Sequence, residues 1–160
     1  MLDLNTFEVI IENAPLVSID LCLVCNGKIL LGNRCNEPLK GQWFTPGGRI
    51  FKNESWQAAL KRIALTELGL PSVKLANFEL MGVWDHFYPN SVCNEKITTH
   101  YVNLPHFIKL ESIPKIRLDR QHNGLRWFDL DAVAKGEGFH EYIKNYAVHL
   151  ANKDGGYVGD

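Results

Sequence analysis

A glutamate near the end of an amphipathic segment is the first residue whose position could support chemistry. The apolar spacing predicts a helix over residues 54–68, and on a helical wheel Glu67 falls inside the apolar arc. That arc consists of Trp56, Ala59, Leu60, Ile63 and Ala64. A buried carboxylate is costly unless it is paired or bound to a cation. Glu67 therefore either turns to solvent at the helix end or helps to hold a hard cation.

The glycine-rich segment before this helix favours the cation. We expect a short strand over residues 42–45, followed by a turn at Pro46-Gly47-Gly48-Arg49. Glycines in such a turn let a polyphosphate approach the backbone and leave carbonyl oxygens exposed. Carboxylate and carbonyl oxygens suit Mg²⁺ that bridges a diphosphate. The turn and Glu67 together indicate a site for a metal-bound diphosphate.

Residues 48–70, GRIFKNESWQAALKRIALTELGL, resemble the Nudix box G-x5-E-x7-R-E-U-x-E-E-x-G-U, in which U is a bulky aliphatic residue. The spacing is kept without an insertion, and the matching residues are Gly48, Glu54, Arg62, Glu67, Gly69 and Leu70. Ile63 and Thr66 stand where the family has glutamates, which ordinary members use for additional metal ions. The resemblance implies an α+β protein with the Nudix fold. This is an α/β/α sandwich with a mixed β-sheet and the box as a loop-helix-loop.

Other segments, in the same order along the chain, are similar to the GDP-mannose mannosyl hydrolase branch, whose box is altered. They are PLVSID ending at Asp20, LLGNR ending at Arg34, GQWFTPGGR ending at Arg49, GVWDHFY over 82–88, TTHY over 98–101, and QH at 121–122. The resemblance implies hydrolysis of GDP-mannose, or of GDP-glucose, by water attack at sugar C1. The alternatives are a conventional Nudix pyrophosphohydrolase, which attacks phosphorus, and a noncatalytic nucleotide-sugar binder.

The resemblance also implies a metal site. It puts one Mg²⁺ per subunit, for which Mn²⁺ can substitute, on the Gly47 carbonyl, Glu67 and Gln121. Diphosphate oxygens complete the shell. One Mg²⁺ with arginines neutralises a departing GDP, so fewer carboxylates are needed than for attack at phosphorus.

The remaining roles carried over from the family concern the substrate. His122 matches the general base that activates water, Arg49 the arginine that helps GDP depart, and Arg34 a second diphosphate contact. The residues that match contacts to the sugar or diphosphate are Asp20, Tyr101, His86 and Tyr88. Without the resemblance, His122 would be interpreted as a loop histidine, and His86 and His100 as hydrogen-bonded, half-buried histidines. Arg62 and Glu54, eight residues apart, would form an ion pair or a loop brace.

The elements that must position these residues are strands mixed with helices. We expect a helix over residues 5–12 capped by Asn5, and a hairpin of strands 16–25 and 28–31 joined by Asn26-Gly27. Longer strands are expected over 78–87 and 98–108, and another strand over 125–129. Helices are expected over 129–134 and 139–151.

Length and composition fit one globular domain. The chain has 160 residues, of which 46% are hydrophobic and 22% charged. We expect a single Nudix domain over 1–153 and a flexible tail over 154–160, which contains three glycines. Lysine and arginine number 17 and aspartate and glutamate 18, a net charge of −1. A basic excess is therefore absent, and we expect no nucleic-acid partner.

Location and assembly follow from what the sequence lacks and from the family. No run approaches the roughly 18–20 apolar residues of a membrane span, and the N-terminus does not resemble a signal peptide. Cys22 and Cys25 lie in an expected strand, where residues three apart point to opposite faces, so buried thiols are favoured over a metal pair. We expect a cytoplasmic protein with no membrane partner. The resemblance adds a homodimer.

Overall fold

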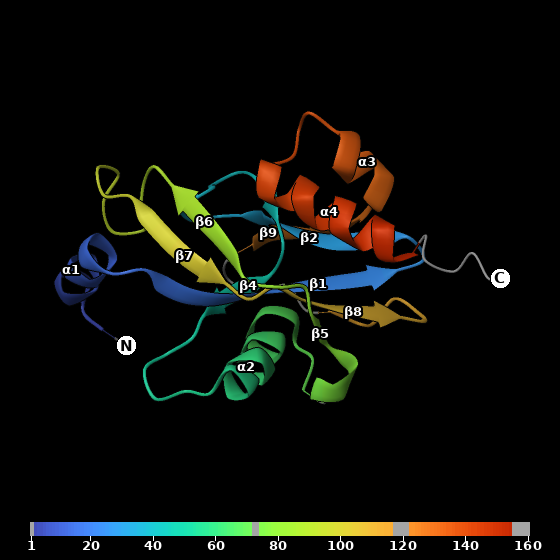
Figure 1. Cartoon of the computed structure of the whole chain (residues 1–160), viewed down its shortest axis with the longest axis horizontal. Coiled ribbons are helices and arrows are strands. Elements are labelled where there is room, and N and C mark those ends of the chain that lie inside the picture. The colour runs from blue at the N-terminus through green and yellow to red at the C-terminus, as the bar shows by residue number, and fades with distance from the viewer. Residues whose placement is uncertain (1, 72–73, 117–121, 155–160) are drawn as a thin grey trace.

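The computed structural model describes residues 2–71, 74–116 and 122–154 of the chain. A mixed β-sheet lies between helices, with α2 on one face and α3 and α4 on the other (Figure 1). The helices are α1 (Leu4–Asn13), α2 (Trp56–Leu68), α3 (Leu130–Lys135) and α4 (Glu141–Asp154), with a 3₁₀ helix over Leu75–Asn77. The strands are β1 (Leu16–Cys25), β2 (Lys28–Arg34), β3 (Trp43–Phe44), β4 (Gly47–Arg49), β5 (Glu79–Leu80), β6 (Trp84–Tyr88), β7 (Thr99–Asn103), β8 (His106–Leu110) and β9 (His122–Asp129). The expected α+β architecture, a mixed sheet between helices, is confirmed.

The long central strand β1 changes partners at Asp20. Its first half pairs antiparallel with β4 and parallel with β7, and Asp20 faces Gly47 at the end of the β4 ladder. From Leu21 onward it pairs parallel with β8, and near its end antiparallel with β2. Strands β6 and β9 extend the sheet by pairing with β7 and β2. Asp20 therefore lies where two groups of strands separate.

Two expected long strands are each broken into two, and both breaks have local causes. Residues 98–108 form β7 and β8 with Leu104 and Pro105 between them, because proline has no N–H to donate to a ladder. Residues 78–87 form β5 and β6, separated around Gly82, whose φ of 128° interrupts the pleat. These breaks let β8 and β7 pair with successive halves of β1.

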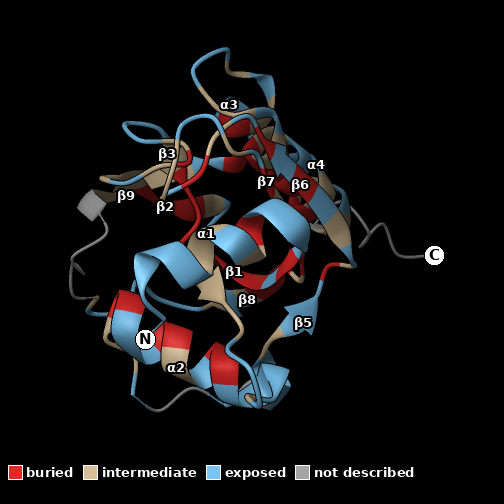
Figure 2. Ribbon diagram, turned by 90° about the vertical axis from the view of Figure 1, so that its left-hand side faces the viewer, coloured by how far each residue is buried: buried red, intermediate tan, exposed pale blue. Residues whose placement is uncertain are grey.

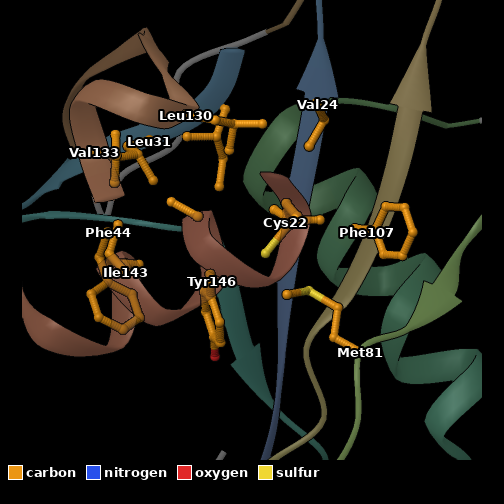
Figure 3. Packing of buried hydrophobic residues seen from close by; sticks show 13 residues of the cluster. Cys22, Val24, Leu31, Phe44, Met81, Phe107, Leu130, Val133, Ile143 and Tyr146 are labelled. Carbon is orange, nitrogen blue, oxygen red and sulfur yellow. The ribbon is translucent and has the colours of Figure 1, made fainter. Parts of the chain in front are cut away.

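Buried side chains fill both sides of the sheet. The cluster under α2 contains Ile19, Leu21, Leu23, Leu30, Ala59, Leu60, Ile63, Ala64 and Leu68. The cluster under α3 and α4 contains Cys22, Val24, Ile29, Leu31, Phe44 and Tyr146 among others (Figure 3). Cys22 and Cys25 are buried free thiols, as expected. Buried and exposed residues alternate along α2 (Figure 2), as the amphipathic pattern predicted.

Three local expectations need correction. The expected turn after Pro46 is strand β4, because its glycines can lie directly against β1. Asp3, not Asn5, caps α1, because its Oδ1 accepts the Thr6 N–H at 3.0 Å. Trp56, expected in the apolar arc of α2, is 44% exposed and its ring stacks on His106 instead.

The ends of other elements differ by a few residues from expectation. The box helix begins after the Ser55 cap, and Gly69 ends it in the left-handed conformation with φ of 65°. The Asn26-Gly27 hairpin is confirmed. Helix α4 continues to Asp154, so the expected tail falls largely on residues 155–160, outside the described residues. Within the described residues no helix has the length and apolar character that a membrane crossing requires.

Candidate active site

A cavity of about 320 Å³ opens where β1 changes partners, and most of the predicted site residues line it. They are Asp20, Arg34, Gly47, Arg49, Glu67, His86, Tyr88 and Tyr101. Gln121 lies outside the described residues, as does the side chain of His122. The backbone of His122 pairs with Arg34 across β9 and β2. Residues from α2, β1, β2, β4, β6 and β7 therefore meet at one place.

Two described residues predicted to hold a metal, Glu67 and Gly47, line the cavity. Glu67 is buried, so it does not turn to solvent at the end of α2. Gly47 lies so close to β1 that a Cβ there would come within 2.5 Å of Asp20 Oδ1 and 2.7 Å of the Ile19 carbonyl oxygen. Only glycine fits this approach. Glu67 and Gly47 both line the cavity, and a carboxylate with a backbone carbonyl is a donor set that suits Mg²⁺ when substrate oxygens complete its shell.

Among the described residues there is no group of three or more His, Cys, Asp or Glu side chains that could hold a metal ion. Ile63, at the position of a family glutamate, is 1% exposed and belongs to the cluster under α2. Thr66, at the other such position, is exposed. The described part of the site thus fits a cation that takes few ligands from the protein.

The loop before α2 is braced by an arginine. Arg62 Nε donates to Glu54 Oε1 at 2.7 Å, and its Nη2 donates to Glu54 Oε2 at 2.8 Å and to the Arg49 carbonyl at 2.9 Å. Glu54 Oε2 also accepts the Phe51 N–H at 3.0 Å. These hydrogen bonds from Arg62 lower the pKa of the Glu54 carboxyl. The interpretation of this pair as a loop brace is confirmed.

Two further arginines give the cavity a positive side. Arg34 lies at the end of β2, where its Nε donates to the Pro38 carbonyl at 2.9 Å. The Arg49 guanidinium lies 3.9 Å from the centre of the Phe7 ring, which belongs to α1. Both arginines line the cavity with Phe7. Guanidinium groups suit the oxygens of a diphosphate, since they bind in a planar, two-pronged geometry.

A buried polar network surrounds Asp20, which lies beside Gly47 at the end of the β4 ladder. The Asn103 amide donates to Asp20 Oδ2 at 2.5 Å, and the Tyr146 hydroxyl donates to the same oxygen at 2.8 Å. His86 lies beside both, with Nδ1 at 3.2 Å from Asn103 Nδ2 and Nε2 at 3.3 Å from the Tyr146 hydroxyl. All four side chains are buried. The network joins β1, β6, β7 and α4.

Burial sets the protonation states in this network. It raises the pKa of Asp20 to about 6, partly offset by the hydrogen bonds from Tyr146 and Asn103. It lowers the pKa of His86 to about 4, with a smaller contribution from His140, so His86 is neutral at pH 7. It also raises the pKa of the Tyr88 and Tyr101 hydroxyls. At neutral pH the cavity therefore contains a neutral imidazole and two protonated phenols.

The sequence did not single out Asn103 and Tyr146. Asn103 ends β7, and its side chain is 1% exposed. Tyr146 is fully buried in the middle of α4, where the pattern predicts only a core aromatic residue. His100, considered with His86, lies elsewhere: it pairs with Asp85 at 2.9 Å and stacks on Phe87. The one signal was that Asp20, a buried charged residue in an apolar strand, requires hydrogen-bond donors.

Comparison with known proteins agrees with this geometry. The family model described as NUDIX domain matches residues 15–147. Low-salt glycan biosynthesis protein Agl8 of Haloferax volcanii is 38% identical over 142 residues, 89% of this chain and 86% of that protein. A MutT NUDIX hydrolase from Burkholderia pseudomallei has a TM-score of 0.70 at 24% identity, covering 86% of this chain and 99% of that chain. The NUDIX domain of Shewanella oneidensis NrtR, complexed with ADP ribose, has a TM-score of 0.67 at 16% identity, covering 88% and 89%.

The chain therefore belongs to the Nudix family of hydrolases. Members of this family generally use a divalent metal ion such as Mg²⁺ and bind nucleoside diphosphate substrates. The cavity matches both properties, since it combines a buried carboxylate and a backbone carbonyl with two arginines.

Proposed function

We propose that this Nudix hydrolase cleaves GDP-mannose, or GDP-glucose, into GDP and the free sugar by water attack at sugar C1. The observation that carries the proposal is the burial of Ile63 in the apolar core, where ordinary members place a metal-binding glutamate. Attack at phosphorus relies on several metal ions, whereas a diphosphate leaving group needs only charge neutralisation. The similarity to a glycan biosynthesis protein supports a sugar-linked substrate.

The residues proposed to hold Mg²⁺ are Glu67, the Gly47 carbonyl and Gln121, one ion per subunit, with Mn²⁺ as a substitute. When bound, the ion supplies positive charge that stabilises the departing diphosphate. Glu67 and Gly47 share the cavity with Arg34 and Arg49, which supports this arrangement.

The reaction is one displacement at carbon. His122 takes a proton from water while the water oxygen bonds to C1, and the bond between C1 and the diphosphate oxygen breaks with its electrons going to GDP. Arg49 and Arg34 bind the diphosphate through its departure. Asp20, Tyr101, His86 and Tyr88 contact the sugar or diphosphate. His86, with a pKa of about 4, is too weak a base at neutral pH to replace His122.

Hydrolysis of GDP-mannose in ¹⁸O-water tests which bond breaks. Attack at C1 gives labelled mannose and unlabelled GDP. Direct attack by one water also inverts the anomeric centre, so proton NMR should detect β-mannose first. A panel of nucleotide sugars with product identification then ranks the substrates. Labelled GMP with mannose 1-phosphate would establish a conventional pyrophosphohydrolase, and no turnover with bound nucleotide sugar would establish a binding protein.

A substitution tests the proposed base separately. His122→Gln should lower kcat by about 10²–10⁴-fold and change KM little, because general-base catalysis acts in the transition state. Wild-type activity should fall as pH drops below the pKa of His122, near 6.5 for an ordinary histidine. A variant that keeps the wild-type kcat and acid limb would exclude His122 as the base.

The proposal includes a homodimer in the cytoplasm, with the GDP-sugar and neither nucleic acid nor membrane as partner. The buried free thiols of Cys22 and Cys25 suit a reducing compartment. Light scattering during size-exclusion chromatography measures the assembly, and a mass of one chain would exclude the dimer.

A further inference from the structure

Tyr146 lies behind the cavity and does not line it. Its side chain is fully buried among apolar residues of the cluster under α4, and Trp84 packs edge-on against its ring at 5.0 Å. In Figure 3 its hydroxyl points away from the apolar side chains of Leu130 and Val24. That hydroxyl touches Asp20 and His86, which do line the cavity.

The positions of the hydrogen atoms follow from counting donors. The Tyr146 hydroxyl has one proton, and an ionised Asp20 can only accept, so this proton goes to Asp20 Oδ2 at 2.8 Å. The Tyr146 oxygen must then accept from its other neighbours. These are Asn103 Nδ2 at 2.9 Å and His86 Nε2 at 3.3 Å. A neutral His86 therefore has its proton on Nε2.

The same count fixes the other nitrogen of the imidazole. With the proton on Nε2, His86 Nδ1 is an acceptor. The Asn103 amide uses both of its protons on Asp20 Oδ2 and the Tyr146 oxygen, so its Nδ2, 3.2 Å from His86 Nδ1, has none left for the imidazole. The donor to His86 Nδ1 is the Tyr88 hydroxyl at 3.4 Å. The Tyr142 ring, stacked on His86 at 3.9 Å, holds the plane of the imidazole. In this arrangement each side-chain N–H and O–H of Asn103, Tyr146, His86 and Tyr88 has an acceptor.

We propose that Tyr146 is a positioning residue that fixes the carboxylate of Asp20 and holds His86 in the Nε2–H tautomer. As a result, Asp20 Oδ1 and the oxygen of Tyr88 are left as acceptors on two residues that line the cavity. Acceptors of this kind suit a ligand that donates hydrogen bonds, as the hydroxyl groups of a sugar do. The effect of Tyr146 on turnover rests on the proposed function. The assignment of the His86 tautomer does not depend on it.

The tautomer is measured by long-range ¹H–¹⁵N NMR on protein labelled at histidine, at pH 8, in EDTA and without substrate. The spectrum of His86→Gln assigns the His86 signals. We expect protonated Nε2 and unprotonated Nδ1 in the wild type, and a shift toward protonated Nδ1 in Tyr146→Phe. The matched control is Tyr142→Phe, which removes a hydroxyl one helical turn earlier that bonds to the Phe87 backbone, and it should keep the wild-type pattern.

Two results would overturn the proposal: a wild-type His86 protonated at Nδ1, or an unchanged Nε2–H pattern in Tyr146→Phe. The first needs no variant, so a failure of Tyr146→Phe to fold leaves the proposal testable.

Turnover provides a second readout. With the sugar nucleotide that the native protein hydrolyses, Tyr146→Phe should lower kcat roughly tenfold to a hundredfold, with KM within about threefold. Wild-type failure to release GDP and mannose, together with the expected NMR pattern, would refute only the proposed function. Wild-type kcat in Tyr146→Phe would refute the positioning role and leave the proposed function standing.

Discussion

The two sides of the cavity are built in different ways. On the α2 side, Glu67, Arg62 and Glu54 come from one continuous segment, and charged side chains brace a surface loop. On the α4 side, Asp20 receives hydrogen bonds from Asn103 and Tyr146, residues 83 and 126 positions away in the sequence. The first side is a local motif, and the second is an assembly of four elements.

The difference shows how charge is accommodated on each side. Glu54 and Arg62 keep partial contact with water, with side-chain exposures of 15% and 29%, and each is paired with the opposite charge. Asp20 has neutral donors as its hydrogen-bond partners in the described network, which leaves its carboxyl with a raised pKa of about 6. Ion pairing lowers the pKa of a carboxyl. Burial raises it, and neutral hydrogen-bond donors offset that rise only in part.

The largest effect of a single substitution is expected on the α2 side, as a loss of activity. Glu67→Gln should lower turnover about 10³-fold, since the charge stabilisation that a metal provides is worth several kcal/mol. Titration of activity with Mg²⁺ measures the loss. Thr66→Ala, at the neighbouring exposed position where the family has a glutamate, should keep wild-type activity. Full activity of Glu67→Gln, or wild-type turnover in EDTA, would mean that Glu67 holds no metal essential for activity.

The loop brace should give the next largest effect. Arg62→Lys keeps the charge but cannot span both Glu54 oxygens and the Arg49 carbonyl. We expect the free energy of unfolding to fall by about 1.5–3 kcal/mol, the usual contribution of hydrogen bonds to charged groups. Urea denaturation measures it, with the exposed neighbour substitution Lys61→Arg as a control. Equal stability of both variants would show that the brace is not needed for folding.

The smallest expected effect is a change in how stability depends on pH when Asp20 is replaced. Because its folded-state pKa is raised from 3.8 to about 6, Asp20 adds stability below pH 3.8 that is lost as pH rises through about 6. His86 acts in the opposite direction, since its pKa is lowered from 6.5 to about 4 and its contribution is lost as pH falls through this range. Asp20→Asn removes the first contribution. On going from pH 7 to 5, this variant should lose about 1 kcal/mol more stability than the wild type.

Chemical denaturation at pH 7, 6 and 5 in EDTA measures this difference. Parallel profiles for the two proteins would mean that the Asp20 carboxyl titrates near its ordinary value. The α4 side would then accommodate an ionised carboxylate at Asp20, as the α2 side does at Glu54.

Local patterns in the sequence determined the α2 side and the first hairpin. The helical spacing of Leu60, Ile63 and Ala64 put Glu67 on the buried face, where the structure has it. The Asn26-Gly27 turn joins β1 to β2, because these residues adopt the positive φ that a tight hairpin requires. Such features depend on residues within one or two turns of each other, so a sequence can specify them alone.

The hydrogen-bond partners of Asp20 on the α4 side follow only from the tertiary structure. Tyr146 has the pattern of a core residue, and Asn103 that of an ordinary strand end, until β1, β6, β7 and α4 meet around Asp20. Likewise, the glycines after Pro46 form β4 and not a turn, because β1 lies beside them and accepts their pairing. Strand partners and hydrogen-bond partners far apart along the chain are chosen by packing, which no local spacing of residues specifies.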